Sequence, residues 1–309
     1  MIGLIILKLI LMPAIAPLCV GLINKWKALL MNRQGAPIIQ PYRDIWKLFH
    51  KDEVIARDTS WIFTFAPFLS FGISLFVPLA VPLLTTGENV APFSHPLVVV
   101  YTLGLSAFFM SLASIDTGSM FGGFGASREV MLSALAEATV IMSVLPAAIL
   151  GGSADISLIA AHIDTLPLSQ FAPIVIAILA FFIALLGDTS RIPFDNPSTH
   201  QELTMIHHAM SIEYSGKRQA LLTWAGANKL LFVIVLGANL FTPWGIVTGT
   251  ITLPALLFAL FAIILKVLLV LVAITFIEIR IARLRFFRLP NLILTSFIIT
   301  AIGIIMAGI

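Results

Sequence analysis

Long apolar runs separated by short polar segments dominate the chain. A membrane-spanning helix needs about 20 predominantly apolar residues, and eight runs are close to or above that length. They lie at about residues 3–23, 62–84, 96–115, 129–150, 169–187, 221–243, 249–277 and 290–308. The alternation of polar and apolar residues that marks membrane β-strands is absent. The pattern predicts an all-α polytopic membrane protein, with eight transmembrane helices in a single integral membrane domain.

One polar segment has a helical pattern of its own. Between the first two runs, five apolar residues recur at helical spacing, interrupted by charged residues. The apolar residues are Tyr42, Ile45, Trp46, Leu48 and Phe49, and the charged ones are Arg43, Asp44 and Lys47. This pattern predicts an amphipathic helix at the membrane interface. Such a helix can anchor the segment, provide a platform for a peripheral partner, or do both.

The composition excludes the soluble classes of protein. Hydrophobic residues make up 59% of the 309 residues and charged residues only 11%, whereas soluble domains carry roughly 25% charged residues. The mean hydropathy is +1.05. The single cysteine, Cys19, cannot form a disulfide within the chain and cannot hold an iron–sulfur cluster by itself. A soluble enzyme, a disordered chain and a disulfide-rich scaffold are therefore all disfavoured.

The basic residues follow the alternation of the loops. Fifteen of the 18 Lys and Arg residues fall in or beside four alternate segments, at about 24–61, 116–128, 188–220 and 278–289. The loops between them, at about 85–95, 151–168 and 244–248, contain none. The positive-inside rule places the four basic segments in the cytoplasm and both termini on the outer side. Because the net charge of +3 then reflects topology, we expect no nucleic-acid partner.

Among the lysines inside the predicted spans, two lie well within the later runs. Lys229 is about two turns inside the sixth run, and Lys266 is roughly 16 Å from the inner end of the seventh. A lysine within the membrane is costly unless it is paired or hydrated. We expect Lys229 either to extend to the interface or to face the interior. We expect Lys266 to face a polar interior path or a partner subunit.

Two glutamates belong to the fourth run. Glu129 and Glu137 are eight residues apart, which places them about 80° apart around a helix and about 12 Å apart along it. Glu137 then lies below the membrane surface, where desolvation disfavours the charged form of a carboxylate. It is suited either to reversible proton binding or to pairing with an arginine such as Arg128 or Arg191.

The third basic segment concentrates titratable residues. Its acids and histidines are Asp188, Asp195, Glu202, Glu213, His200, His207 and His208. Two prolines, Pro193 and Pro197, forbid one continuous helix, and a helix is predicted over about 198–212. Asp188 and Arg191 would pair if the preceding helix continued. We expect a hydrated proton route or a docking site here, and no metal site, because the histidine spacing is poor for chelation.

Several motifs closely resemble one family. They are Arg33-x-Gly35, Gln40-x-Tyr42-Arg43-Asp44-Ile45-x-Lys47-Leu48, Asp116-Thr117-Gly118-Ser119, Gly125-Ala126-Ser127-Arg128-Glu129, Arg191-x-Pro193-Phe194-Asp195 and Glu213-Tyr214-Ser215-Gly216. The family is that of complex I subunit 1, a membrane subunit that respiratory complex I (NADH-quinone oxidoreductase) shares with the energy-converting hydrogenases. Within it, these stretches look most like hydrogenase-4 component C and formate hydrogenlyase subunit 4. The similarity covers nearly the whole chain.

The resemblance implies a non-catalytic subunit of a prokaryotic cytoplasmic (inner) membrane complex. In the family, this subunit docks soluble hydrogenase-like and iron–sulfur subunits, which hold the nickel–iron or iron–sulfur centres, and it adjoins antiporter-like membrane subunits. It links electron transfer to proton translocation. No cofactor is then expected on this chain, although quinone binding is possible because complex I members form a quinone chamber.

The residue pattern and the resemblance together indicate two groups of site residues. The expected proton path comprises Glu129, Glu137, Asp188, Asp195, His200, Glu202, Glu213 and Lys266. A second group is expected either to dock the soluble subunits, which together form the soluble arm of the complex, or to form the wall of the quinone chamber. Its members are Arg33, Arg43, Asp44, Lys47, Asp116, Arg128 and Arg191.

Two departures from the family pattern lie at the expected chamber wall. Ser198 and His200 stand where the family usually has glutamates, and Pro37 is displaced by one position after Arg33-Gln-Gly35. His200 is a possible titrating substitute. These changes disfavour ordinary quinone binding. A quinone-chamber subunit of a complex I-like enzyme and a stand-alone secondary transporter remain as alternatives.

Overall fold

The computed structural model describes residues 2–56, 58–86, 93–167, 170–195, 205–247 and 252–308. Within these ranges the chain is helical, apart from turns and one isolated bridge between Thr85 and Val247. In chain order the helices are α1 (Ile2–Leu30), α2 (Gln40–Phe49), α3 (Trp61–Phe76), the 3-10 helix η1 (Val77–Ala80), α4 (Pro96–Asp116), α5 (Met120–Gly151), α6 (Ile156–Ile163), α7 (Ala172–Asp188), α8 (His207–Met210), α9 (Gly216–Phe241), α10 (Leu253–Arg280), the 3-10 helix η3 (Phe286–Arg288) and α11 (Leu289–Ala307).

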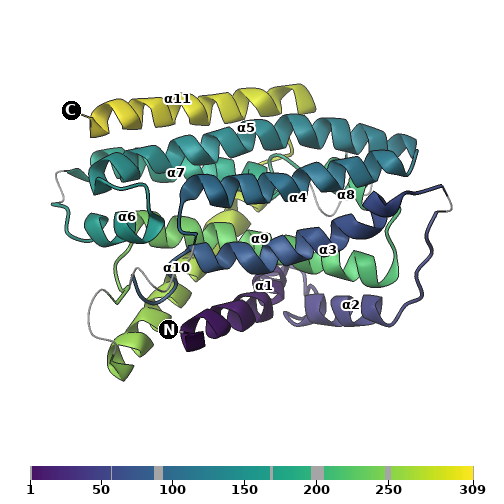
Figure 1. Ribbon diagram of the computed structural model, residues 1–309, viewed down its shortest axis with the longest axis horizontal. Coiled ribbons are helices and arrows are strands. Elements are labelled where there is room, and N and C mark those ends of the chain that lie inside the picture. The colour runs from purple at the N-terminus through teal and green to yellow at the C-terminus, as the bar shows by residue number, and fades with distance from the viewer. Residues whose placement is uncertain are drawn as a thin grey trace.

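The long helices form a bundle around α9. Figure 1 shows α3, α4, α5 and α11 running side by side along the longest axis, with the N- and C-termini toward the same end of the bundle. Helix α9 packs against α1, α2 and α3, and α5 packs against α4, α7 and α11. Most of α9 is buried by these neighbours. The bundle therefore has an apolar centre, and its outer helices expose apolar side chains as a lipid-facing surface requires.

Seven of the described helices are long and apolar enough to cross a membrane, and the 17-residue α7 is apolar but shorter. The prediction of an all-α membrane protein is confirmed, and the count of eight spans is close. Helix α5 begins at Met120 rather than near residue 129, so the expected loop over 116–128 shrinks to residues 117–119. The first nine residues of α5 contain no proline, and their three glycines are tolerated in the helix because this segment packs closely against α4 and α8.

Three further differences are local, and a proline or a polar residue explains two of them. The second predicted span ends in η1, where Pro78 interrupts the regular helix. The segment predicted as a loop over 151–168 contains α6, because the Asp155 carboxylate caps the backbone N–H groups of Ser157 and Leu158. Of the helix predicted over about 198–212, only residues 205–212 are described, and among these only α8 is helical.

The amphipathic helix predicted in the first polar segment is confirmed as α2. It buries Ile45 and exposes Arg43, Asp44, Trp46 and Lys47. Helix α2 packs against α9 and α1, and the hydroxyl of Tyr42 donates a hydrogen bond to the carbonyl of Ala14 in α1. The helix is thus attached to the bundle by its apolar face and presents its charged face outward.

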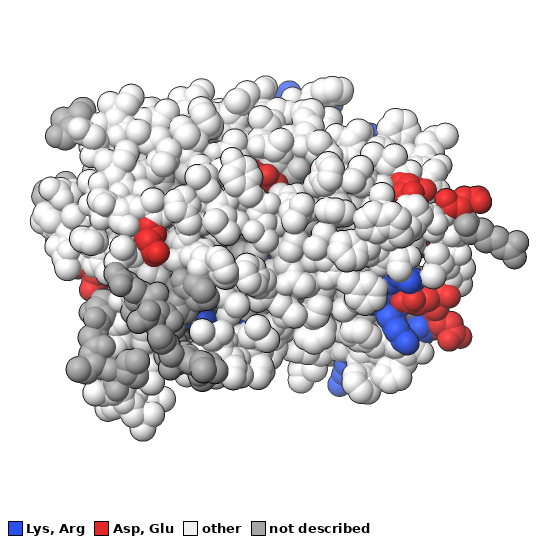
Figure 2. Space-filling model, viewed as in Figure 1, with Lys and Arg blue, Asp and Glu red and all other residues white. Residues whose placement is uncertain are grey.

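Charged side chains gather at one end of the molecule. Figure 2 shows most of the charges of this face beside α2 and the nearby ends of α3 and α4, whereas the middle of the face is almost uncharged. We call this the basic end and define it by the helix termini Leu30, Asp116, Asp188 and Arg280. The segments that follow these termini hold most of the chain's lysines and arginines.

Candidate functional site

A cavity of about 290 Å³ opens inside the bundle near the basic end. Side chains of α1, α3, α4, α5, α8 and α9 line it, together with the turn that follows α7. We call it the central cavity. Its charged and titratable lining residues are Glu129, Asp188, Arg191, His207, His208 and Lys229.

The deeper wall of the central cavity mixes apolar and hydroxyl groups. Val20, Ile73, Leu103, Met110 and Leu222 supply apolar surface. The polar lining residues pair across helices in two hydrogen bonds, from Ser106 Oγ to Ser70 Oγ (3.0 Å) and from Asn228 Nδ2 to Ser74 Oγ (3.0 Å). The cavity is therefore amphipathic, with its charges at one side.

Lys229 and Asp188 form an ion pair at the wall of the cavity. The ammonium of Lys229, in α9, lies 2.9 Å from Asp188 Oδ1 at the end of α7. This contact explains how Lys229 is accommodated inside a predicted span, because a nearby carboxylate offsets the cost of removing the ammonium group from water. The expected pairing of Asp188 with Arg191 does not form, since α7 ends at Asp188 and the chain turns at Ser190, whose φ is 51°.

His207 and Glu129 form a second pair. Helix α8 approaches α5 closely because Gly125 has no side chain; a Cβ there would lie 2.7 Å from Ala209 Cβ. This approach brings His207 Nδ1 to 3.4 Å from Glu129 Oε1. The side chain of His207 is 47% exposed, toward the central cavity that it lines. Its removal from bulk water lowers its pKa, but the hydrogen bond and the negative charge of Glu129 outweigh this effect, so that the pKa lies above its usual value of 6.5.

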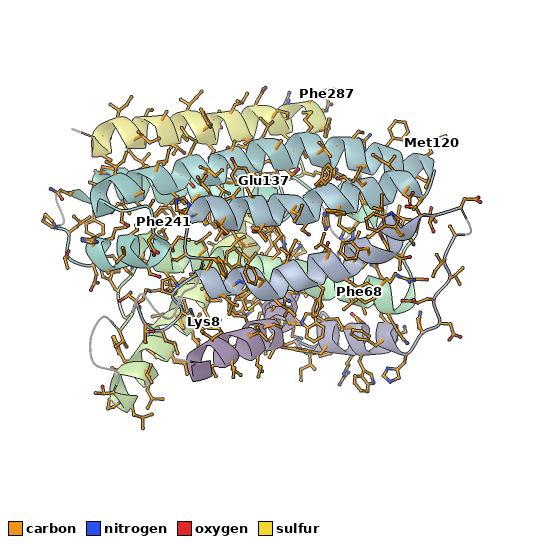
Figure 3. The ribbon with its side chains drawn as sticks, in the orientation of Figure 1. Lys8, Phe68, Met120, Glu137, Phe241 and Phe287 are labelled. Carbon is orange, nitrogen blue, oxygen red and sulfur yellow. The ribbon has the colours of Figure 1, made fainter. Side chains whose placement is uncertain are left out.

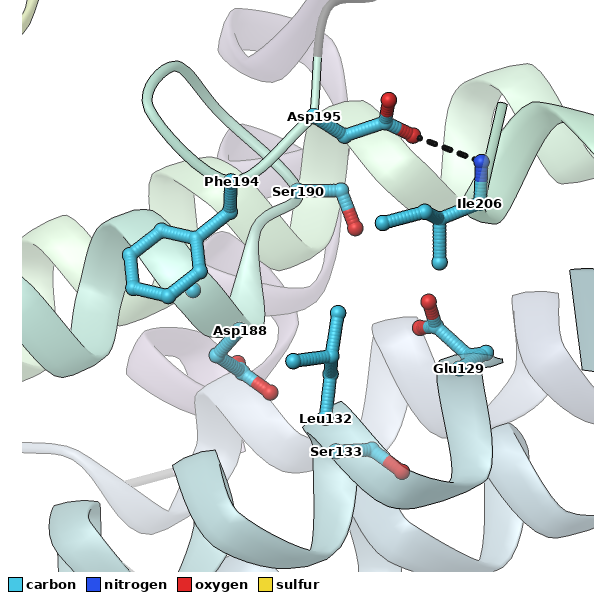
Figure 4. A pocket seen from close by; sticks show the side chains of 9 residues that line it. Glu129, Leu132, Ser133, Asp188, Ser190, Phe194, Asp195 and Ile206 are labelled. Atoms are coloured by element: carbon cyan, nitrogen blue, oxygen red, sulfur yellow. Dashed lines mark hydrogen bonds between the residues drawn. The ribbon is translucent and has the colours of Figure 1, made fainter. Parts of the chain in front are cut away.

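Asp195 holds the start of α8 in place. Its Oδ2 atom accepts hydrogen bonds from the backbone N–H groups of Ile206 and His207, each at 3.2 Å, and Figure 4 shows the first of them. Its Oδ1 atom lies 3.4 Å from Arg283 Nη2. Between these groups, a side pocket of about 10 Å³ is lined by Glu129, Asp188 and Asp195, which is room for about one water molecule.

Glu137 lies further along α5, away from the basic end. It is half-buried and lies within electrostatic range of Asp188, Lys229 and Glu129. Figure 3 places its side chain between α4 and α5. A Cβ at Gly104 of α4 would lie only 2.7 Å from Glu137 Oε2, so this glycine makes room for the carboxylate. The structure thus brings together four of the expected proton-path residues: Glu129, Glu137, Asp188 and Asp195.

A third ion cluster contains a residue that the sequence analysis missed. Glu278 of α10 is fully buried, with Lys27 Nζ 2.7 Å from its Oε2 atom and Arg191 Nη1 3.3 Å from its Oε1 atom. It joins α1, α10 and the turn after α7. A signal for it existed, because Glu278 is the single acidic residue after Glu213 and stands among the arginines of the last basic segment.

The remaining expected residues lie outside the central cavity or beyond the described part of the chain. Arg33, Arg43 and Lys47 are exposed near α2, where Asp44 accepts a hydrogen bond from Gln40. Asp116 instead fastens the start of α3 by accepting hydrogen bonds from the backbone N–H and the hydroxyl of Ser60. Arg128 donates to the Met205 carbonyl and lies over the ring of Phe286. Glu213 is exposed, Lys266 lies on α10, and His200 and Glu202 fall outside the described residues.

The described residues contain no group of three or more His, Cys, Asp or Glu side chains arranged to hold a metal ion. The central cavity is lined by carboxylates, imidazoles and cationic side chains, which bind, release and orient protons.

Comparisons with known proteins agree with the motifs. A family model described as NADH dehydrogenase matches residues 2–309. Formate hydrogenlyase subunit 4 of Escherichia coli (strain K12) is 33% identical over 284 residues, which cover 92% of this chain and 91% of that protein. Hydrogenase-4 component C of the same organism is 34% identical over 291 residues, which cover 94% and 90%. NADH-quinone oxidoreductase subunit 8 of Rhodothermus marinus is 29% identical over 204 residues, which cover 60% and 55%.

The fold is shared with a chain in the solved structure of the membrane-bound sulfane sulfur reductase, an archaeal respiratory membrane complex. The TM-score is 0.84 at 23% identity, and the match covers 99% of each chain. The family match over almost the entire length and the two relatives above 30% identity confirm the resemblance read from the motifs. The chain therefore belongs to the NADH dehydrogenase family of complex I subunit 1-like membrane proteins.

Proposed function

We propose that this chain is the membrane-anchor and energy-coupling subunit of a hydrogenase-4 or formate-hydrogenlyase-like oxidoreductase complex. It docks a soluble redox arm at the basic end and links electron transfer there to proton translocation in the membrane. The arm comprises hydrogenase-like and iron–sulfur subunits that hold the redox centres, and antiporter-like subunits adjoin the chain within a prokaryotic cytoplasmic membrane. The relatives named as formate hydrogenlyase and hydrogenase-4 subunits support this proposal.

The observation that favours energy coupling is the continuity of the charged groups. Starting from the basic end, Asp195 holds α8, His207 of α8 contacts Glu129, and Glu129 shares the side pocket with Asp188. Asp188 then pairs with Lys229, and both lie in electrostatic range of Glu137. Because neighbouring charges influence one another's protonation, a change imposed at Asp195 by the soluble arm alters proton binding as far as Glu137.

The decisive experiment separates electron transfer from proton movement. In the assembled complex, Glu137→Gln and Glu129→Gln replace a carboxylate by an amide of the same shape. We expect electron transfer to continue, while proton translocation per electron falls severalfold, because the amide cannot exchange a proton at these positions. Asp52→Asn is the matched control, since Asp52 is exposed and lies outside the central cavity. Normal proton translocation by both glutamate variants would refute the coupling role.

The docking role has its own test. The exposed cations Arg33 and Arg43 lie beside and on α2 at the basic end. Replacing either by glutamate reverses its charge, and we expect less of the soluble arm to remain attached during purification. Arg33→Lys retains the charge and serves as the control. If the arm co-purifies equally with the glutamate variants, the segment around α2 only anchors the chain to the membrane.

A quinone-chamber subunit is the second candidate, and the amphipathic wall of the central cavity favours it. A volume of about 290 Å³ is near the lower end of small-molecule sites, which span about 300–1,000 Å³. Bound quinone extracted from the purified complex, together with inhibition by compounds that fill a quinone chamber, would favour this candidate. Absence of both would leave the cavity as a hydrated proton path.

A further inference from the structure

Lys266 is a membrane-embedded cation that the central cavity does not use. It lies in α10, thirteen residues after Leu253 and fourteen before Arg280, and it does not line the cavity. At about 1.5 Å per residue, its Cα atom is about 20 Å along the helix from either end. Its ammonium group is therefore placed where the helix is surrounded by apolar side chains, such as those of Leu265 and Leu269.

Within the described residues, Lys266 forms no ion pair and no side-chain hydrogen bond. Asp164, at the end of α6, attracts it only from beyond the 4.0 Å that defines an ion pair. The lysine in α9 behaves differently, because Lys229 lies 2.9 Å from Asp188. Since an unpaired cation inside a membrane is costly, the half-buried Lys266 calls for a counter-charge beyond those that the described residues supply, and a neighbouring subunit can provide one.

The helix face around Lys266 is shaped for the close approach of another helix. At 100° per residue, all four alanines of α10 lie within about 40° of the direction of Lys266. They are Ala255, Ala259, Ala262 and Ala273. Small residues at such positions let helix backbones come close together in a membrane. This chain already covers part of the face, because Ala259 is buried and a Cβ at Gly245, after α9, would lie 2.6 Å from Ala262 Cβ. Ala273, by contrast, is exposed.

We propose that Lys266 pairs with a carboxylate on a transmembrane helix of a partner subunit, which packs along α10 beside Lys266 and Ala273. The partner is a protein helix because Lys266 lies further along α10 from both ends than its four-carbon side chain reaches, which separates it from lipid phosphates. An aspartate or glutamate inside the partner's helix would be as costly alone as the lysine, so pairing stabilises both. The inference rests on the proposed function only in that the chain works within a membrane complex.

A photo-crosslinking experiment on the intact complex locates the partner. A photoreactive phenylalanine derivative replaces Leu269, which is 63% exposed and one turn from Lys266. As the control, it replaces Ile264, which is 48% exposed and points about 160° away from Lys266. We expect position 269, and not 264, to crosslink to a membrane helix that contains Asp or Glu at the depth of Lys266. Crosslinks to lipid alone, or equal crosslinks from both positions, would overturn the proposal.

Charge variants test the pairing itself. Lys266→Met keeps the length of the side chain and favours membrane insertion, so the chain still reaches the membrane. We expect about tenfold less of the crosslinked membrane partner to co-purify with it, while the soluble arm stays attached. Leu265→Met, at the neighbouring exposed position, should change nothing. Lys266→Glu should lose the partner too, and replacing the partner's carboxylate by lysine should restore it.

The outcomes separate this inference from the proposed function. Unchanged recovery of the membrane partner with Lys266→Met, or failure of the reversed pair to restore it, overturns the pairing and leaves the proposed docking and coupling roles intact. Loss of the soluble arm from the unmodified complex would count against those roles and not against the pairing.

Discussion

Glu278 shows how one residue can connect distant parts of the chain. Its fully buried carboxylate lies between Lys27 of α1 and Arg191 of the turn after α7. A buried carboxylate with two cations is well compensated, whereas either cation alone in the same place would not be. The cluster therefore holds the turn that contains Arg191, which also lines the central cavity.

At the residue scale, we first predict that Glu278→Gln destabilises the protein. The amide keeps the shape of the side chain but leaves Lys27 and Arg191 without a counter-charge, which should lower the free energy of unfolding by about 3 kcal/mol. The thermal unfolding temperature of the purified protein in detergent measures this change. Glu213→Gln removes an exposed carboxylate and should leave that temperature unchanged. An equal temperature for Glu278→Gln would show that the cluster adds no stability.

The second residue-scale prediction concerns pH. Desolvation in the central cavity and the charge of Lys229 lower the pKa of His207, but Glu129 and Asp195 raise it more, so that it lies above 6.5. A raised pKa means that the pair stabilises the folded protein fully below about pH 6.5. This stabilisation is lost as the pH rises through the raised pKa.

His207→Gln should therefore flatten the decline of the unfolding temperature between pH 6 and pH 9, because glutamine does not titrate. His162→Gln, an exposed histidine on α6, is the control and should follow the unmodified protein. Identical pH profiles for His207→Gln and the unmodified protein would show that the contact with Glu129 does not contribute to stability.

At the element scale, a proline and a glycine decide how α1 meets its neighbours. Pro17 has no backbone N–H, so the carbonyl of Pro13 lacks its usual partner one turn later. The indole N–H of Trp224 in α9 donates to that carbonyl at 2.9 Å. Further along α1, Gly21 faces the backbone carbonyl of Ile38 so closely that a Cβ would overlap it. The segment that leads into α2 therefore depends on a glycine at position 21.

We predict that Gly21→Ala displaces this segment and, with it, α2. Because the obstacle is backbone and not a movable side chain, the free energy of unfolding should fall by about 1–3 kcal/mol. If α2 contributes to docking, the soluble arm should also detach more easily. Gly72→Ala, in α3 with no atoms near the added Cβ, should be neutral or slightly stabilising. Equal stability of the two variants would contradict the proposed packing of α1.

At the scale of the whole molecule, the basic residues predict the orientation in the membrane. The positive-inside rule places the basic end in the cytoplasm. A cysteine introduced by Lys51→Cys, which is exposed near α2, should react with a membrane-impermeant maleimide only after cell lysis. A cysteine introduced by Thr165→Cys, exposed after α6, should react in intact cells. The opposite labelling pattern would reverse the orientation and place the docking surface on the outer side.

Most of the fold could be predicted from local patterns, and the exceptions have physical reasons. The apolar runs predicted the long helices, because a chain in lipid must satisfy its backbone hydrogen bonds within each helix. The pattern misplaced the start of α5 because residues 120–128 contain three glycines, which disfavour an isolated helix, whereas packing against α4 and α8 keeps this segment helical in the fold. The pattern missed α6 because this helix is much shorter than the apolar runs that predict membrane spans. Its start depends on one capping residue, Asp155.

The sequence by itself determined the class of protein, its family and the end of the bundle where the titratable residues gather. Hydropathy and charge distribution are sums over neighbouring residues, so they can be read without coordinates. Only the tertiary structure decided the pairing: Asp188 with Lys229, His207 with Glu129, and Glu278 with Lys27 and Arg191. Each partner comes from a different helix or turn, and the distance between two charges depends on how helices pack, which spacing along the chain does not specify.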